Sequence, residues 1–199
     1  MSIEGTRAEV LALMHRLETE PEHTLHVARL TLRLFDDLRP EHGWGDTDRL
    51  LLEAAACLHD IGWSVAKDGA RHHKESARLI REHNWQTLDP ADVNLVALIA
   101  RYHRKALPHT DHAEFALLPA AEQRRVEELA ALLRVGDALD RQHLQKVKSL
   151  VARRLPGKIW VKLDSPRAVE DEIRTALKKA DLARRVFECE WLFEWSAPG

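Results

Sequence analysis

Two adjacent side chains, His59 and Asp60, are the first candidates for chemistry in this sequence. They follow the almost wholly apolar run Leu50–Leu58, and Gly62 comes two residues later. Such a run, without a helical stripe, predicts a helix that is buried on most sides and ends at the glycine. An unpaired carboxylate at the end of a buried helix costs roughly several kcal/mol. A bound cation would remove that cost, and imidazole with carboxylate is a common ligand pair.

A purely structural role fits the same pair, with Asp60 paired to an arginine and His59 donating to a carbonyl. Other residues of the same types bear on this choice. They stand at unusual places on three more predicted helices: Asp137 on an apolar stripe, His103 after an apolar end, and His23 and His26 on one face. Together they would bring ligands from four helices to one point, as helical metalloproteins do. Imidazole and carboxylate without thiolate favour Mn, Fe, Ni, Co or Mg over structural zinc.

The spacing of apolar residues predicts the elements that must position these side chains. The predicted helices begin near Thr6, Pro21, Asp48, His72, Pro90 and Ala120, and the last runs to His143. After residue 145 the pattern changes to strands. Alternating segments at Val147–Arg153, Lys158–Leu163 and Cys189–Trp195 flank one helix at Arg167–Ala180. We therefore expect a mainly α protein, with a helical domain at 1–145 and a small α+β subdomain at 146–199 built as an antiparallel sheet with one covering helix.

The predicted sheet has more apolar surface than one short helix can cover. Trp191, Phe193 and Trp195 alternate along one strand, and Ile159 and Val161 along another. We expect the uncovered part to dock on the helical domain or on a second copy of the chain, as a homodimer.

Composition sets the broad class of protein. The formal net charge is only −2, and 12 histidines are the outlier. Two cysteines, Cys57 and Cys189, make no disulfide framework, and we find neither a signal peptide nor an apolar run long enough for a membrane span. We therefore expect a cytoplasmic protein without a membrane partner. An excess of Lys and Arg after residue 140 carries no nucleic-acid-binding motif, which disfavours that class.

Several short motifs resemble a known family when they are taken together. HTLHV at 23–27, LHDIG at 58–62 and GDALD at 136–140 resemble an HD-domain metal-dependent phosphohydrolase. HHKESARLI, LVALIARYHRK and LLRVGDALDR are similar, more closely, to the C-terminal HD region of the exopolyphosphatase and guanosine pentaphosphatase (Ppx/GppA) family, over roughly residues 20–145. The actin-like catalytic part of those phosphatases is not in this sequence, so we expect any activity to come from the HD site.

The resemblance implies a ligand set for one or two divalent ions. The implied ligands are His23 (rather than His26), His59, Asp60, Asp137, and, in members with two metals, His72 (with His73 as the substitute) and His103. Of these, His59, Asp60, His72 and His103 are implied to be catalytic. Basic residues beside the ligands are candidates for phosphate binding, or alternatively are solvated helix ends: Lys74, Arg101, Arg104 and Lys105. Asp140 and Arg141 are candidates for orienting the ligands from outside.

The chemistry that follows is hydrolysis of a phosphoester by water activated on a divalent cation. We expect a phosphorylated small molecule as substrate, a nucleotide first. The alternative is a regulatory module that binds metal and a phosphorylated ligand, such as a nucleotide or polyphosphate, without turnover.

Overall fold

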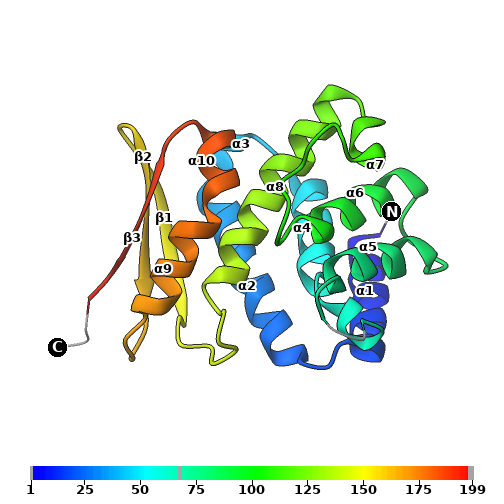
Figure 1. Cartoon of the computed structure of the whole chain (residues 1–199), viewed down its shortest axis with the longest axis horizontal. Coiled ribbons are helices and arrows are strands. Elements are labelled where there is room, and N and C mark those ends of the chain that lie inside the picture. Colours follow the sequence, from blue (N-terminus) through cyan, green and yellow to red (C-terminus); the bar gives the residue numbers. More distant parts are fainter. Residues whose placement is uncertain (1, 67–68, 197–199) are drawn as a thin grey trace.

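The computed structural model describes residues 2–66 and 69–196, and it confirms a mainly α fold with a small sheet near the C-terminus (Figure 1). The helices of the first part are α1 (Ile3–Leu17), α2 (Pro21–Asp37), α3 (Arg39–His42), α4 (Asp46–Leu58), η1 (Ile61–Ser64, a 3-10 turn), α5 (His72–Glu82), α6 (Pro90–Arg101), α7 (Ala113–Ala116) and α8 (Ala120–Ala138). In the described residues we find no helix with the length and hydropathy that a membrane span requires.

Helix α4 lies at the centre of the bundle because it is apolar almost all round. It contacts α1, α2, α6 and α8, and its residues from Leu50 to Leu58, other than Glu53, are buried. The helix ends at Leu58 and not at Gly62 as the sequence suggested. His59 and Asp60 therefore lie in the short turn between α4 and η1.

Two glycines allow the close helix approaches that shape this region. A Cβ on Gly62 would lie 2.1 Å from the carbonyl oxygen of His72 and 2.5 Å from the amide nitrogen of Ser76, so η1 rests directly on the start of α5. A Cβ on Gly136 would lie 2.0 Å from Thr31 Oγ1, so α8 rests directly on α2. Neither approach leaves space for a side chain.

Helix α8 is shorter than its apolar pattern predicted. The prediction that it runs to His143 is wrong, because the helix ends at Ala138 and the chain then turns. His143 and Gln145 take left-handed backbone conformations, with φ of 56° and 48°. The turn is held by Asp140 Oδ1, which accepts from the Gln145 amide at 2.6 Å.

The C-terminal sheet is mixed, and the prediction of an antiparallel sheet with one helix is wrong. Its elements are β1 (Ser149–Leu155), β2 (Lys158–Asp164), α9 (Glu170–Lys179), α10 (Asp181–Phe187) and β3 (Glu190–Trp195). β1 and β2 pair antiparallel, with Leu150 opposite Leu163, whereas β2 and β3 pair parallel, with Ile159 opposite Trp191. Two helices instead of one connect β2 to β3, and this crossover returns the chain to the end where β2 began.

The apolar face of the sheet docks on the helical part of the same chain. α9 and α10 lie between the sheet and α8, and β1 contacts α2 (Figure 1). Buried residues of the strands, such as Val161 and Phe193, belong to one core cluster with those of the bundle. Docking on the helical domain is thus the arrangement in this structure, while a homodimer and a domain boundary at residue 145 stay predictions.

Candidate metal centre

Six His and Asp side chains from five segments of the chain meet beside the end of α4. They form two groups, each of which could hold a metal ion: His23, His59 and Asp137 in the first, and Asp60, His72 and His103 in the second. Within each group the ligand atoms lie within 4.8 Å of one another. Ligands that share one ion at bonds of about 2.0–2.2 Å lie at most about 4.4 Å apart, so only a small contraction would be needed.

The carboxylate of Asp60 lies between the two groups. Its Oδ1 is 3.1 Å from His72 Nε2 and 3.4 Å from His103 Nε2, while its Oδ2 is 3.6 Å from His59 Nε2. His59 Nε2 is in turn 3.9 Å from Asp137 Oδ1. One carboxylate therefore faces the imidazoles of both groups, one oxygen to each.

Hydrogen bonds on the far side of each imidazole fix its orientation. The Nδ1 atoms of His59, His72 and His103 donate to the carbonyl oxygens of Ala56, Gly69 and Ala100 at 2.7, 2.6 and 2.7 Å. A carbonyl can only accept, so each Nδ1 carries a proton and each Nε2, the atom that bears the lone pair in a neutral ring, faces the centre.

The fourth imidazole is oriented by a carboxylate. His23 Nδ1 donates to Asp140 Oδ2 at 2.8 Å, and both side chains are buried. A carboxylate behind a histidine ligand is a common way to orient the ring and to raise its basicity. Asp140 thus lies where the sequence suggested, whereas Arg141 lies on the wall of the cavity described below.

Several buried polar atoms at the centre have no hydrogen-bond partner among the described residues. They are His23 Nε2, His59 Nε2 and Asp60 Oδ1. Buried polar groups are normally satisfied, and lone pairs that face one another repel. Divalent cations would satisfy these atoms, since imidazole nitrogen and carboxylate oxygen are their usual ligands. The residues present therefore fit one or two ions.

Ionisation of the second group also suits a metal. Burial by itself would raise the pKa of the Asp60 carboxyl, but the imidazoles of His59, His72 and His103 outweigh it and hold that pKa well below its usual range. Burial holds the pKa of His103 well below its ordinary value, although Asp60 opposes this. At neutral pH Asp60 is thus charged and His103 is neutral, which are the forms that bind a cation.

In the first group, neighbouring charge outweighs burial at His59, in contrast to His103 of the second group. Burial acts to lower the pKa of His59, but the carboxylates of Asp60 and Asp137 outweigh it, and the pKa is raised. The imidazole is thus drawn toward its cationic form by negative charge that a metal ion could balance instead.

A cavity of about 180 Å³ opens over the second group. Its walls are formed by Asp60, Trp63, His72, His103, Arg104, Asp137, Arg141, His143 and Lys179. The indole of Trp63 stacks on the His72 ring, with 4.2 Å between ring centroids. Sequence reasoning missed Trp63, His143 and Lys179. Trp63 comes directly after LHDIG and could have been noticed, but no spacing connects Lys179 to the motifs.

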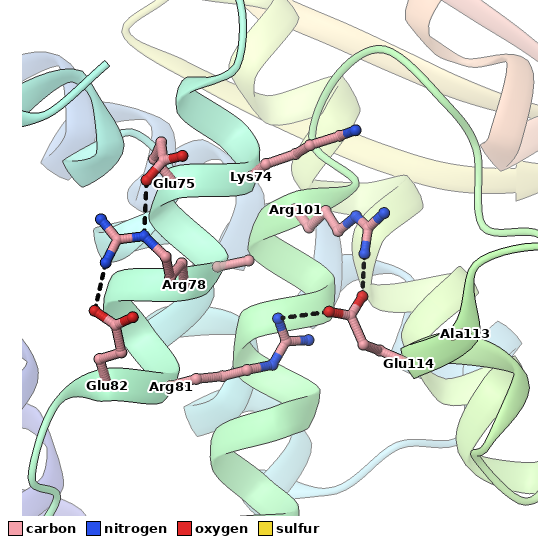
Figure 2. A pocket seen from close by; sticks show the side chains of 9 residues that line it. Lys74, Glu75, Arg78, Arg81, Glu82, Arg101, Ala113 and Glu114 are labelled. Atoms are coloured by element: carbon pink, nitrogen blue, oxygen red, sulfur yellow. Dashed lines mark hydrogen bonds and ion pairs between the residues drawn. The ribbon is translucent and has the colours of Figure 1, made fainter. Parts of the chain in front are cut away.

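Among the four basic residues that the sequence suggested for phosphate binding, Arg104 is the one that lines this cavity. Lys74 and Arg101 lie on a separate surface cavity of about 630 Å³ between α5, α6 and α7, where Arg101 pairs with Glu114 (Figure 2). Residues two apart on a helix face opposite sides, so Lys74 points away from His72. Lys105, beyond the end of α6 with φ of 60°, is exposed and lines neither cavity.

The structure also distinguishes His23 from His26, and His72 from His73, as members of the two groups. His23 belongs to the first group and His26 does not, since His26 accepts from Arg29 on the same helix at 2.8 Å. His72 belongs to the second group and His73 does not. Burial, the larger cause, and the nearby His72 imidazole lower the pKa of His73 to about 4. His26 and His73 are buried structural neighbours of the centre.

Comparison with known families agrees with this geometry. A family model described as Ppx/GppA phosphatase, domain III matches residues 6–185. The match begins within α1, continues through α9 and ends within α10, so it includes every residue of the centre and Lys179. The family points to a phosphatase-related function, and the His and Asp groups are consistent with a divalent metal. The chain belongs to the Ppx/GppA phosphatase domain III family.

Proposed function

We propose that this chain is a metal-dependent phosphohydrolase whose active site is the centre around Asp60. The observation that carries the proposal is the position of the Asp60 carboxylate, with Oδ1 beside His72 and His103 and Oδ2 beside His59. A carboxylate between two sets of imidazoles is suited to bridging two cations. Asp60 also lies on the wall of a cavity, where a substrate could reach it.

The six ligands divide the work between two sites. His23, His59 and Asp137 would hold one ion, His72 and His103 a second, and Asp60 both. When bound, such cations supply activated water and neutralise charge on a phosphoryl group. One or two ions of Mn, Mg, Ni, Co or Fe suit this set of imidazole and carboxylate ligands.

The chain's own residues orient the ligands and receive the substrate. The hydrogen bonds from Nδ1 to backbone carbonyls orient the rings of His59, His72 and His103 so that their Nε2 atoms face the centre. Arg104 lines the cavity with Nη1 3.1 Å from His72 Nε2, where its guanidinium can bind phosphate oxygens. A phosphorylated small molecule, a nucleotide first, is the substrate class that we propose.

A second candidate function is a regulatory module that binds metal and a phosphorylated ligand without turnover. The observation in its favour is that the matching family model is domain III of a phosphatase and not its actin-like catalytic part. The same ligands and the same cavity would serve this function. Turnover is what separates the two candidates.

Hydrolysis of p-nitrophenyl phosphate and bis(p-nitrophenyl) phosphate by the purified chain, with and without added manganese, tests the proposal. We expect manganese-dependent release of p-nitrophenol and loss of both activity and bound metal in Asp60→Ala, with an unchanged helical circular dichroism spectrum. Metal bound without turnover of these esters or of a nucleotide panel would favour the regulatory module. Full activity in Asp60→Ala under matched metal would show that this centre is not the catalyst.

A further inference from the structure

The C-terminal segment contributes a cation to the metal cavity. Lys179, the last residue of α9, lines that cavity together with Arg104 and Arg141. In the described part of the chain its ammonium makes no ion pair within 4.0 Å, although it lies in the field of Asp137. Lys179 is thus a partly buried cation that no carboxylate of the described residues neutralises through a direct ion pair.

A buried arginine fixes this lysine relative to the metal ligands. Arg134 on α8 donates from Nη2 to both carboxylate oxygens of Asp181 at 3.0 Å, and from Nη1 to the carbonyl oxygen of Tyr102 at 3.0 Å. Tyr102 directly precedes the ligand His103, and Asp181 comes two residues after Lys179. One guanidinium therefore ties the junction of α9 and α10 to the segment that carries a ligand, which leaves Lys179 little freedom to move away.

The cavity wall carries both acidic and basic side chains. The carboxylates that line the cavity are Asp60 and Asp137, and both belong to the ligand groups. Apart from these two ligands, no lining residue carries a carboxylate that could pair with the basic residues Arg104, Arg141 and Lys179. Bound divalent cations would neutralise the carboxylates and leave the basic wall uncompensated, so an anion with more than one negative charge would be favoured.

The size of the cavity limits what can be enclosed. At about 180 Å³ it is smaller than the roughly 300–1,000 Å³ of sites that enclose a drug-sized ligand. It can take a phosphoryl group, while the remainder of a nucleotide would lie outside, beside the partly exposed Trp63.

We propose, building on the phosphohydrolase function above, that Lys179 with Arg104 and Arg141 binds a terminal phosphate, and that the site thereby prefers phosphomonoesters to phosphodiesters. A monoester carries a charge of about −1.5 to −2 at pH 7, as phosphorylated side chains do, whereas a diester carries only one negative charge. Lys179, the third basic residue on the wall, favours the monoester because it can bind this additional negative charge. The C-terminal α+β segment is then part of the active site, through α9.

Substitution of Lys179 tests this assignment with a matched neighbour as control. Lys179→Met removes the cation, Lys179→Arg retains it, and Lys178→Met makes the same change at an exposed residue outside the cavity. We expect kcat/KM for p-nitrophenyl phosphate to fall by about 10- to 100-fold in Lys179→Met, as for loss of a charged hydrogen bond. The bis ester should change by less than about threefold, and Lys179→Arg should recover most of the loss.

Binding provides a readout that does not depend on turnover. Titration of inorganic phosphate into the metal-loaded protein by calorimetry should show binding that is weakened in Lys179→Met and unchanged in Lys178→Met, while metal content stays equal in all variants. Equal losses for the monoester and the diester, or unchanged phosphate binding in Lys179→Met, would overturn the proposal. If the wild type hydrolyses neither ester, and Lys179→Met binds phosphate more weakly than the wild type, the anion site stands and the phosphohydrolase function fails.

Discussion

Asp140→Asn is the most discriminating change at the candidate centre, because it keeps the shape of a buried side chain and removes one acceptor. Asp140 accepts two hydrogen bonds, one from His23 Nδ1 at 2.8 Å through Oδ2 and one from the Gln145 amide at 2.6 Å through Oδ1. An asparagine offers one acceptor oxygen and one NH2 group. In either orientation of the amide, one of the two N–H donors then faces another donor.

Two magnitudes follow from this geometry. A buried donor left without an acceptor costs about 1–3 kcal/mol, so the free energy of unfolding of the metal-free protein should fall by about that amount. Loss of the carboxylate behind a histidine ligand typically reduces metal affinity by about 10- to 100-fold. Both losses should appear together in Asp140→Asn, since the same carboxylate holds the turn after α8 and orients His23.

The assay is a competition for manganese or zinc with a chromophoric chelator, paired with urea unfolding in EDTA. Asp37→Asn is the matched control, because Asp37 accepts from the Ala152 amide at 2.8 Å and from Arg33 Nε at 3.0 Å. Asp37 lies 14 residues from His23 on the same helix, about 21 Å along its axis. The control should lose stability with no change in metal affinity.

Unchanged metal affinity in Asp140→Asn would refute the reasoning. Either His23 would not be a ligand, or its ring would be held by something other than Asp140. If Asp140→Asn and Asp37→Asn lost metal affinity equally, the loss would come from a general destabilisation of the fold and not from the contact with His23.

Two further changes test how the centre is built. Gly62→Ala should lower the free energy of unfolding by about 1–3 kcal/mol and weaken metal binding, because the added Cβ would strike the His72 carbonyl oxygen. Gly45→Ala is the control in the same urea and chelator measurements, because its Cβ would meet only Asp48 Oδ2 at 3.9 Å. His73, with a pKa lowered to about 4, stays neutral in the folded state while the unfolded state gains a proton below about pH 6.5, so stability should fall as the pH drops from 6.5 toward 4. Urea unfolding in EDTA at pH 7 and pH 5 should show this loss, about 1–2 kcal/mol, reduced in His73→Gln; an equal loss in the variant would assign it to other groups.

The types of the ligands and the main helices and strands could be predicted from the sequence, because both depend on short stretches of neighbouring residues. An apolar run followed by His59 and Asp60 predicts a buried helix with a costly carboxylate at its end, whatever the rest of the fold. Alternation at Ile159 and Val161 likewise predicts a strand with one apolar face. Helices that start at Pro21 and Pro90 were predicted for the same local reason, the fixed φ of proline in a first turn.

Only the tertiary structure decided which atoms meet and in which direction. From the sequence, Lys74 was a candidate for phosphate binding because it lies beside His72, and nothing pointed to Lys179. The docking of α9 on α8 brings Lys179 to the cavity, while the helical turn directs Lys74 elsewhere. In the same way, alternation gives no strand direction, so the parallel pairing of β3 came from the two-helix crossover. The physical reason is that periodicity fixes which face of an element is apolar, whereas distances between elements depend on long-range contacts such as the approach of Gly136 to Thr31.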